Sequence, residues 1–353
     1  MDNTPSSNTG TPGWDALNAA LGALYPGQAP KHFGTAVPHT LGGQDPLDGI
    51  SVYWAPSPRP HWHYVTYGFS ELYDKQSDDP ADSGYGFELT FRAAATPRQG
   101  ADDAPPVWPM HLLQNLARYV FGTGNVLEAG HHLDANGPIA LETDTVLRHL
   151  ALVEDPQLPA RDTANGRVRF LQVVGLGEQE MAAVRRWSTQ GVLAVLEPAM
   201  PLWVTDLGRG DLLDDPALAA QVEAGSAREG STTGTLFVET LGWEQDGDVV
   251  ELVLGAGQVP GLLELLPLRL GHGRTLTLMD RERAWRFETG AADAVQVGPE
   301  QAHCRLAPAS LRALLDHLRA QRGVYPLPGG WLRVRVEPTE LRDAQGQVIR
   351  TLG

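Results

Sequence analysis

The side chains best suited to metal chemistry are two pairs of histidines. His61 and His63 lie two residues apart in the alternating segment HWHYVTYG, so a strand would place both on one face. His131 and His132 are adjacent, with carboxylates before and after them. Because imidazole and carboxylate groups together bind zinc, these four histidines define one hypothesis, a metal-dependent hydrolase. Two observations count against it: any HxH on a strand shares a face, and the sequence has no HExxH motif.

Two further groups of chemical residues have structural explanations. Glu154 and Asp155 could form an acid–base pair, but adjacent strand residues point to opposite faces and Pro156 is typical of a strand end. A capping or groove-lining role is therefore favoured. Residues 175–177 (GLG) have the spacing of a dinucleotide loop, yet the third glycine position holds Glu180, which would repel a pyrophosphate. Since GxSxG, Walker A and Ser/His/Asp patterns are also missing from the sequence, we predict no enzyme, no cofactor and no metal.

The composition is that of an ordinary soluble globular protein, with 42% hydrophobic and 20% charged residues. Its 353 residues are enough for two hydrophobic cores. The net charge of −16 disfavours nucleic acid, which requires clustered cations, and is compatible with a basic protein partner. No apolar run approaches the roughly 20 residues of a membrane helix, so we predict no membrane association.

The cysteine count and the N-terminus indicate where the protein resides. Cys304 is the single cysteine, which excludes an internal disulfide and a multi-cysteine zinc site. We expect a buried, inert thiol in a reducing cytoplasm. Residues 1–13 are polar and lack the regions of a secretory signal, so we expect a disordered leader and a cytoplasmic protein.

Hydrophobic periodicity predicts a mixture of helices and strands, and therefore an α+β protein. Helical spacing is found at residues 15–25, 109–122, 178–187 and 310–322. Strand-like patterns are found at residues 61–68, 86–92, 145–153, 167–174, 201–206, 248–254, 274–279, 284–288 and 331–337. In the strand at 86–92 (GFELTFR), we expect Glu88, Thr90 and Arg92 on the solvent side.

Shifts in composition predict two domains. The N-terminal domain covers residues 14–245 and includes a flexible loop at 211–235, which is acidic and then rich in Gly, Ser and Thr. Within it, residues 215–222 (DPALAAQV) are compatible with a short helix. The junction is placed near 240–247, and a smaller C-terminal α+β domain covers 246–353. We expect each domain to consist of a mixed or antiparallel sheet with packed helices.

Four aromatic-rich segments occur in order in the first half: LGGQDPLDGISVYW from Leu41, HWHYVTYGFSELY from His61, GYGFELTFR from Gly84 and WPMHLLQNLARYVFG from Trp108. Together they resemble the N-terminal domain of the Suppressor of fused family. The likeness continues through LVEDPQ, RFLQVVG and WVTD, at residues 152–157, 169–175 and 203–206. The second domain is similar through LPLRLGHGR and YPLPGGWLRVRV, at residues 266–274 and 325–336.

The resemblance implies that two α+β domains form a clamp around a short extended peptide, which adds a strand to their sheet edges. The partner-binding residues that it implies are Tyr119, His131, Glu154, Leu270 and His272. His131 departs from the family pattern, which has an acidic residue before a histidine, so we expect a different preferred peptide.

The primary hypothesis is therefore a non-enzymatic protein that holds an extended peptide or a partner protein in a cleft between its domains. The resemblance further implies a bacterial immunity protein that neutralises a toxin. The alternatives are the metal-dependent hydrolase with its four histidines, and a scaffold or dimerisation module. The sequence leaves the oligomeric state open.

Overall fold

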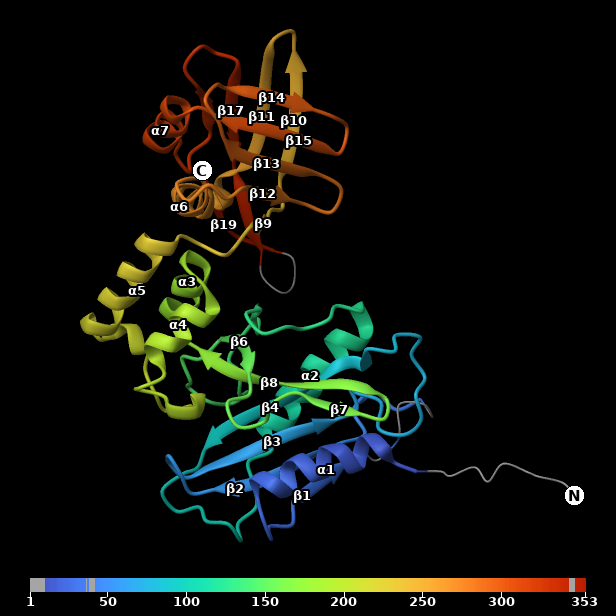
Figure 1. Cartoon of the computed structure of the whole chain (residues 1–353). Helices are drawn as coiled ribbons and strands as arrows, with labels where there is room; N and C mark the ends of the chain where they lie inside the picture. Colours follow the sequence, from blue (N-terminus) through green and yellow to red (C-terminus); the bar gives the residue numbers. More distant parts are fainter. Residues whose placement is uncertain (1–9, 36, 38–41, 343–346) are drawn as a thin grey trace, which may run out of the picture. The chain divides into compact units, whose positions relative to one another are not determined.

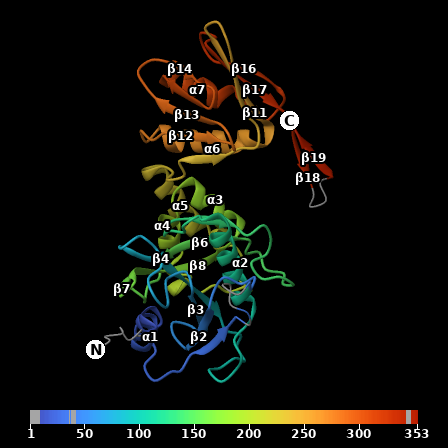
Figure 2. The same ribbon diagram turned by 90° about the vertical axis from the view of Figure 1, so that its right-hand side faces the viewer.

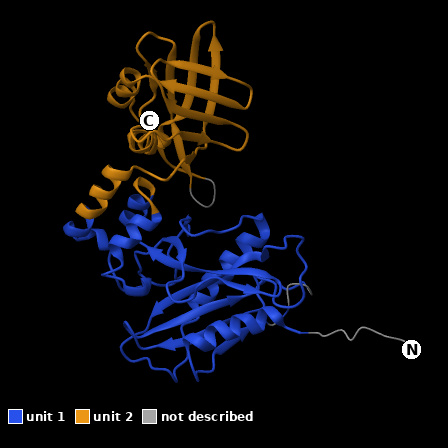
Figure 3. Cartoon of the chain, viewed as in Figure 1, with its two compact units in different colours: residues 1–184, 189–219 blue, residues 185–188, 220–353 orange. Residues whose placement is uncertain are grey.

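In the computed structural model the chain divides into two compact units. The first consists of residues 1–184 and 189–219, and the second of residues 185–188 and 220–353 (Figure 3). The structure describes residues 10–35, 37, 42–342 and 347–353. Residues 1–9 of the predicted leader therefore lie outside the described residues, and its last two residues begin a helix.

The first unit is built on one mixed sheet with helices on both faces (Figure 1). Its strands are β1 (Lys31–Gly34), β2 (Gly49–Ala55), β3 (His61–Tyr67), β4 (Asp82–Ala94), β5 (His132–Asp134), β6 (His149–Glu154), β7 (Arg161–Thr163) and β8 (Gly166–Leu176). They lie in the order β1-β2-β3-β4-β8-β6-β5, with β7 paired to β8. The described helices are α1 (Pro12–Leu24), α2 (Trp108–Thr123), α3 (Glu178–Arg186) and α4 (Thr189–Leu196), with 3-10 turns η2 (Pro201–Trp203) and η3 (Leu212–Asp214).

The helices α1 and α2 cover opposite faces of this sheet (Figure 2). On one face Leu17 and Leu21 of α1 are buried against Tyr53 and Tyr67. On the other face α2 buries a stripe of apolar residues, Leu113, Leu116, Ala117 and Val120. The apolar faces predicted for both helices are confirmed in these positions.

The central strand β4 is buried on both faces, so the prediction of a half-buried strand is wrong. Glu88, Thr90 and Arg92 are each fully buried. They lie between β3 and β8, on the sheet face to which α1 also packs. Alternation alone does not distinguish a solvated polar face from a buried one whose groups are hydrogen-bonded within the protein.

Residues 201–206 do not form the predicted strand. They form η2 and a single parallel bridge between Thr205 and Ala93 of β4. Leu202 and Trp203 have φ values of 55° and 48°, which are incompatible with an extended chain. The prediction fails because apolar residues in a short run do not reveal a left-handed turn.

The predicted flexible loop at 211–235 is largely helical. The helix α5 (Pro216–Glu229) crosses from the first unit into the second. A Cβ on its Gly225 would lie 2.4 Å from a ring atom of Trp187, so this glycine permits close packing against the indole. The Ser226 hydroxyl donates to the carbonyl of Arg186 at 3.2 Å and fixes the same contact.

The second unit contains two larger sheets, one two-stranded sheet and one apolar core. One of the larger sheets has the order β10-β11-β17-β16 and the other has the order β14-β15-β13-β12-β9. The strands are β9 (Thr235–Phe237), β10 (Leu241–Asp246), β11 (Val249–Gly255), β12 (Leu276–Met279), β13 (Ala284–Thr289), β14 (Ala294–Val297), β15 (Gln301–Leu306), β16 (Gly323–Pro326) and β17 (Leu332–Glu337). The helical segments are η4 (Ala256–Gln258), α6 (Val259–Leu270) and α7 (Pro308–His317), and β18 (Thr339–Arg342) pairs with β19 (Val348–Leu352).

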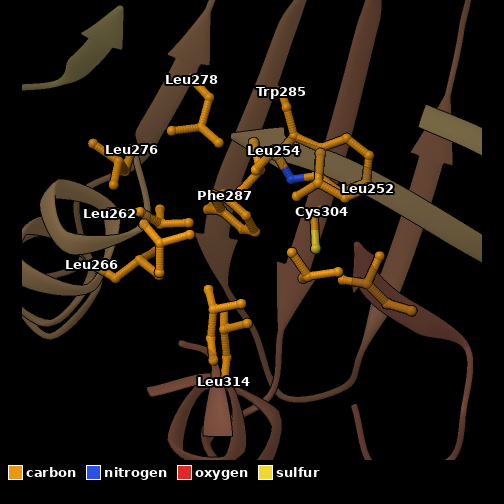
Figure 4. Packing of buried hydrophobic residues seen from close by; sticks show 14 of the residues in the cluster. Leu252, Leu254, Leu262, Leu266, Leu276, Leu278, Trp285, Phe287, Cys304 and Leu314 are labelled. Atoms are coloured by element: carbon orange, nitrogen blue, oxygen red, sulfur yellow. The ribbon is translucent and has the colours of Figure 1, made fainter. Parts of the chain in front are cut away.

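Figure 4 shows the core of the second unit. Trp285 and Phe287 of β13 lie beside Cys304 of β15, among leucines from β11, α6, β12 and α7. Cys304 is fully buried, as predicted, and burial raises the pKa of its thiol. This unit therefore holds its sheets together through apolar contacts.

The domain boundaries stay a prediction. The strand β9 precedes the predicted junction near 240–247, and it pairs in parallel with β12 of the second unit.

Throughout the part of the chain that the structure describes, no helix is long and apolar enough to cross a membrane.

Candidate functional site

The strand β5 forms one edge of the first unit's sheet. On its inner side, the N–H of Leu152 in β6 donates to the carbonyl of His131 at 2.9 Å. The N–H of Ala135 donates at 3.0 Å to the carbonyl of Arg148, the residue before β6. In an antiparallel ladder this alternation directs the backbone N–H and C=O of Asp134 away from β6. At Asp134 the outer side of β5 is therefore suited to pairing with another strand.

A groove of about 710 Å³ lies beside this edge, between α2 and the segment that follows β5; we call it the β5 groove. Its apolar lining consists of Trp108, Leu112, Leu116, Leu133, Ile139, Leu141 and Leu150. Its polar lining includes His111, Asn115, Tyr119, Asp134, Asn136 and Glu142. Apolar pockets of this size with a few polar groups are typical of binding sites.

The outer rim of the β5 groove combines exposure with backbone strain. Leu141 is 80% exposed, although a leucine is usually buried. The next residue, Glu142, has a φ of 61°, a left-handed conformation that costs about 1–3 kcal/mol in a residue other than glycine. Both features are typical of a surface shaped for contact with a ligand.

The structure brings three of the predicted partner-binding residues to this region. Tyr119 of α2 lines the groove, and its hydroxyl accepts a hydrogen bond from Asn125 at 2.8 Å. His131 precedes β5, and its Nδ1 accepts from the Glu128 N–H at 3.2 Å. Glu154 is exposed at the end of the neighbouring strand β6. Their roles in binding stay a prediction.

The other two predicted residues belong to the second unit. Leu270, the last residue of α6, is only 3% exposed and packs in the apolar core. His272 is exposed and follows the end of the helix. The side chain available for a partner is therefore that of His272, while Leu270 mainly supports the fold.

The four histidines of the hydrolase hypothesis do not form one site. His61 and His63 lie on β3, whereas His131 and His132 lie at β5. Four inter-strand steps separate β3 from β5, which at about 4.8 Å each amount to roughly 19 Å. Among residues 10–35, 37, 42–342 and 347–353, no group of three His, Cys, Asp or Glu side chains could hold a metal ion. The structure thus gives the hydrolase hypothesis no support.

His63 belongs instead to a buried polar network centred on Arg92. The Arg92 guanidinium donates to both carboxylate oxygens of Asp155, at 2.7 and 3.0 Å, and also to Gln172. Asp155 accepts further bonds from the Thr90 hydroxyl at 2.6 Å and from two backbone N–H groups that follow it. The predicted capping role is therefore found for Asp155, next to exposed Glu154.

Burial fixes the charge states in this network. It lowers the pKa of His61 and of His63 to about 4, and the positive charge of Arg92 adds to the effect. Burial opposes ionisation of Asp155, but the hydrogen bond with His63 and the positive charge and hydrogen bonds of Arg92 outweigh it and hold the pKa of Asp155 well below its usual range. At neutral pH both histidines are neutral, and Arg92 balances the charge of Asp155.

The GLG segment at residues 175–177 is a turn between β8 and α3. The buried Glu180 carboxylate accepts from Arg209 at 2.7 Å and from the Gly177 N–H at 2.9 Å. The position that a pyrophosphate would require is therefore occupied by the protein's own ion pair.

Sequence reasoning did not identify the segment from Leu133 to Glu142, which forms one wall of the β5 groove. The only signal is the short apolar run at residues 138–141 between polar residues (NGPIALETD), and a run of four apolar residues is not distinctive.

Comparisons with known proteins agree with this fold. The family model described as Suppressor of fused protein (SUFU) matches residues 43–210, which include the whole β5 groove. The Suppressor of fused homologs of Homo sapiens and Mus musculus are each 37% identical over 238 residues, which cover 62% of this chain and 48% of each homolog. A chain of a Sufu–Fu complex crystal structure is 34% identical with a TM-score of 0.56, over 60% of this chain and 97% of that chain. This protein belongs to the Suppressor of fused family.

A second solved structure extends the Suppressor of fused match to both units. The crystal structure of Drosophila Suppressor of Fused superposes with a TM-score of 0.82 at 25% identity, over 96% of this chain and 99% of that chain. The predicted α+β fold of the Suppressor of fused type is thereby confirmed. The matched region spans about half the length of the two curated homologs.

Proposed function

We propose that this Suppressor of fused protein captures an extended segment of a partner protein along β5, with alternate side chains of the segment in the β5 groove. Backbone pairing would supply affinity, and the groove would supply specificity. The observation that carries the proposal is the outer side of β5, with which no described strand pairs, next to an apolar groove. We propose no catalytic step.

A relative supports a protein partner. The Sufu–Fu complex is a structure of that relative with a second protein. The carboxylates of Asp134 and Glu142 line the β5 groove, and the net charge is −16, so a segment with basic residues is favoured. A protein toxin with such a segment would make this chain an immunity protein of a bacterial cytoplasm, as the resemblance implies.

Site-specific photocrosslinking in the native host tests the proposal. A benzoylphenylalanine at Leu141, on the rim of the groove, is expected to give one dominant protein adduct whose crosslink maps to a single short segment. The control is the same probe at Val324 of the second unit, which is also exposed. Adducts spread over many proteins, or equal yields at both positions, would contradict the proposal.

Two substitutions sharpen this test. Tyr119→Ala and Glu154→Ala are each expected to weaken binding of the crosslinked segment about tenfold, the usual cost of losing one anchoring side chain. Glu197→Ala, an exposed glutamate at the end of α4, is the charge-matched control and is expected to bind normally. If the Tyr119 and Glu154 variants both bind like the control, these two residues are not partner contacts.

A further inference from the structure

The first unit has a second cavity, of about 780 Å³, where the connection from β3 to β4 turns back on itself. One wall is a cluster of three aromatic rings, Phe69, Tyr85 and Phe121. The Phe121 ring lies 5.0 Å from the ring of Tyr85 and 5.9 Å from that of Phe69, between centroids. No residue is shared with the lining of the β5 groove, so we treat this aromatic cavity as a separate site.

The charged residues that line the aromatic cavity are all acidic. Asp48, Glu71 and Asp74 line it, and its described lining contains no Lys, Arg or His. The Glu71 carboxylate is already balanced by Lys75, whose Nζ lies 3.1 Å away. Asp48 is half-buried, and its carboxylate forms no ion pair with a Lys, Arg or His in the part of the chain that the structure describes. The cavity therefore holds negative charge next to aromatic rings.

Buried side chains beneath the cavity fix its walls. The Glu88 carboxylate accepts from the N–H groups of Gly68 and Ser70 at 3.0 and 2.9 Å, and from the Ser70 hydroxyl at 2.6 Å. Asn165, 4% exposed, donates to the carbonyls of Glu71 and Tyr73 at 2.8 and 2.7 Å. A loop held in this way is preorganised, so a ligand would not need to order it.

We propose that the aromatic cavity binds an organic cation, a guanidinium or ammonium group on an apolar stem. A cation is attracted to the negative face of an aromatic ring, and the attraction strengthens where water is excluded. Asp48 supplies the opposite charge, while the ring cluster packs against the stem. The volume accommodates a group of this size together with neighbouring atoms of the molecule that carries it.

The test is calorimetric titration of the full chain with N-acetyl-arginine methylamide. The matched neutral probe is N-acetyl-citrulline methylamide, which has the same shape without the charge. We expect the arginine compound to bind about tenfold more tightly than the citrulline compound. Amide chemical shifts should change at Gly68, Tyr73 and Gly84 around the cavity. Equal affinity for the two probes, or no binding at about 10 mM, would overturn the proposal.

Variants locate the site independently of the probe. Asp48→Asn and Tyr85→Leu are each expected to weaken arginine binding at least about fivefold with an unchanged melting temperature. Asp78→Asn, on an exposed residue of the same loop outside the lining, removes an equal charge and is expected to change binding less than about twofold. Equal losses in Asp48→Asn and Asp78→Asn would show only general charge attraction and would refute the site.

Agmatine distinguishes the source of the cation. Binding of agmatine as tight as that of the arginine amide assigns the cavity to free amines, whereas preference for the amide assigns it to a polypeptide side chain. Because the aromatic cavity shares no lining residue with the β5 groove, loss of either function would leave the other measurable.

Discussion

The two units bury different kinds of side chain. The first unit encloses ionisable groups that include His61, His63, Glu88, Arg92 and Asp155, each hydrogen-bonded inside the protein. In the second unit the buried described residues are apolar apart from glycines and a few serines. Stability of the first unit should therefore depend on pH and on single polar partners, whereas that of the second should depend mainly on packed volume.

The physical basis of this difference is the cost of an unpaired buried charge. A buried ion pair adds little net stability, because desolvation offsets most of the attraction, but removal of one partner leaves a charge that water cannot reach. An apolar core contains no charge that could be left unpaired. Each truncation of an apolar side chain there costs the transfer free energy of the removed atoms and the energy of the cavity that they leave.

The largest effect is expected for Arg92→Met. This change leaves the Asp155 carboxylate buried without its cation and should lower the free energy of unfolding by about 3–5 kcal/mol. The control is Arg335→Met on β17, whose partially exposed side chain pairs with Glu251 at 2.7 Å and should contribute at most about 1 kcal/mol. Urea unfolding at pH 7 measures the change in free energy of unfolding for both variants. Similar losses in the two variants would contradict the proposed difference between the units.

Acid should affect the first unit selectively. The pKa of His61 and of His63 is about 4 in the folded protein and about 6.5 in the unfolded chain. The two histidines therefore contribute to the free energy of unfolding above about pH 6.5, and this contribution is lost as the pH falls. Glu88 has the opposite effect on stability as the pH falls, because burial raises its pKa to about 7 and the folded state therefore favours its protonated form. Together, the three groups should lower the free energy of unfolding by about 2 kcal/mol between pH 7 and pH 5.

Hydrogen exchange resolves this prediction by element. Protection of the β3 and β4 amides should fall between pH 7 and pH 5 after correction for intrinsic exchange rates, while that of β13 and β15 should stay unchanged. A uniform fall in both units would contradict the assignment to the buried histidines.

Substitution of Glu88 by glutamine separates the two opposing contributions. Its amide oxygen can accept from Gly68 and Ser70 as the carboxylate does, and its NH₂ can donate to the Thr66 hydroxyl, which then donates to the Leu89 carbonyl. The loss between pH 7 and pH 5 should increase to about 4 kcal/mol, because the compensating titration is gone. Glu88→Ala, which leaves these donors without an acceptor, should destabilise the protein at every pH.

Much of the first unit follows from periodicity and motif, and some of it does not. The positions of α1, α2 and the strands that contain HWHY and RFLQVVG follow from 3.6- and 2-residue spacing. The solvent side assigned to Glu88 and Arg92 was wrong, since their partners Ser70 and Asp155 are brought near only by the fold. Long-range pairing of polar groups leaves no local trace in a sequence.

The candidate site shows the same limit. Tyr119 and Glu154 followed from motif resemblance, and the structure places them near β5. The opposite wall of the β5 groove depends on the turn after β5, where Glu142 is left-handed, and residue types do not reveal that turn. The separation of His61 and His63 from His131 and His132 likewise depends on strand order, which periodicity does not provide.

The central claim is that an extended partner segment pairs with the outer side of β5, and Asp134→Pro tests it most directly. The N–H of Asp134 faces away from β6, so proline removes a donor to an added strand without removing a bond of the sheet. Asp134→Ala controls for the side chain. We predict that Asp134→Pro binds the crosslinked segment at least about tenfold more weakly than Asp134→Ala, with an equal melting temperature. Equal affinities of the two variants would contradict strand addition at β5.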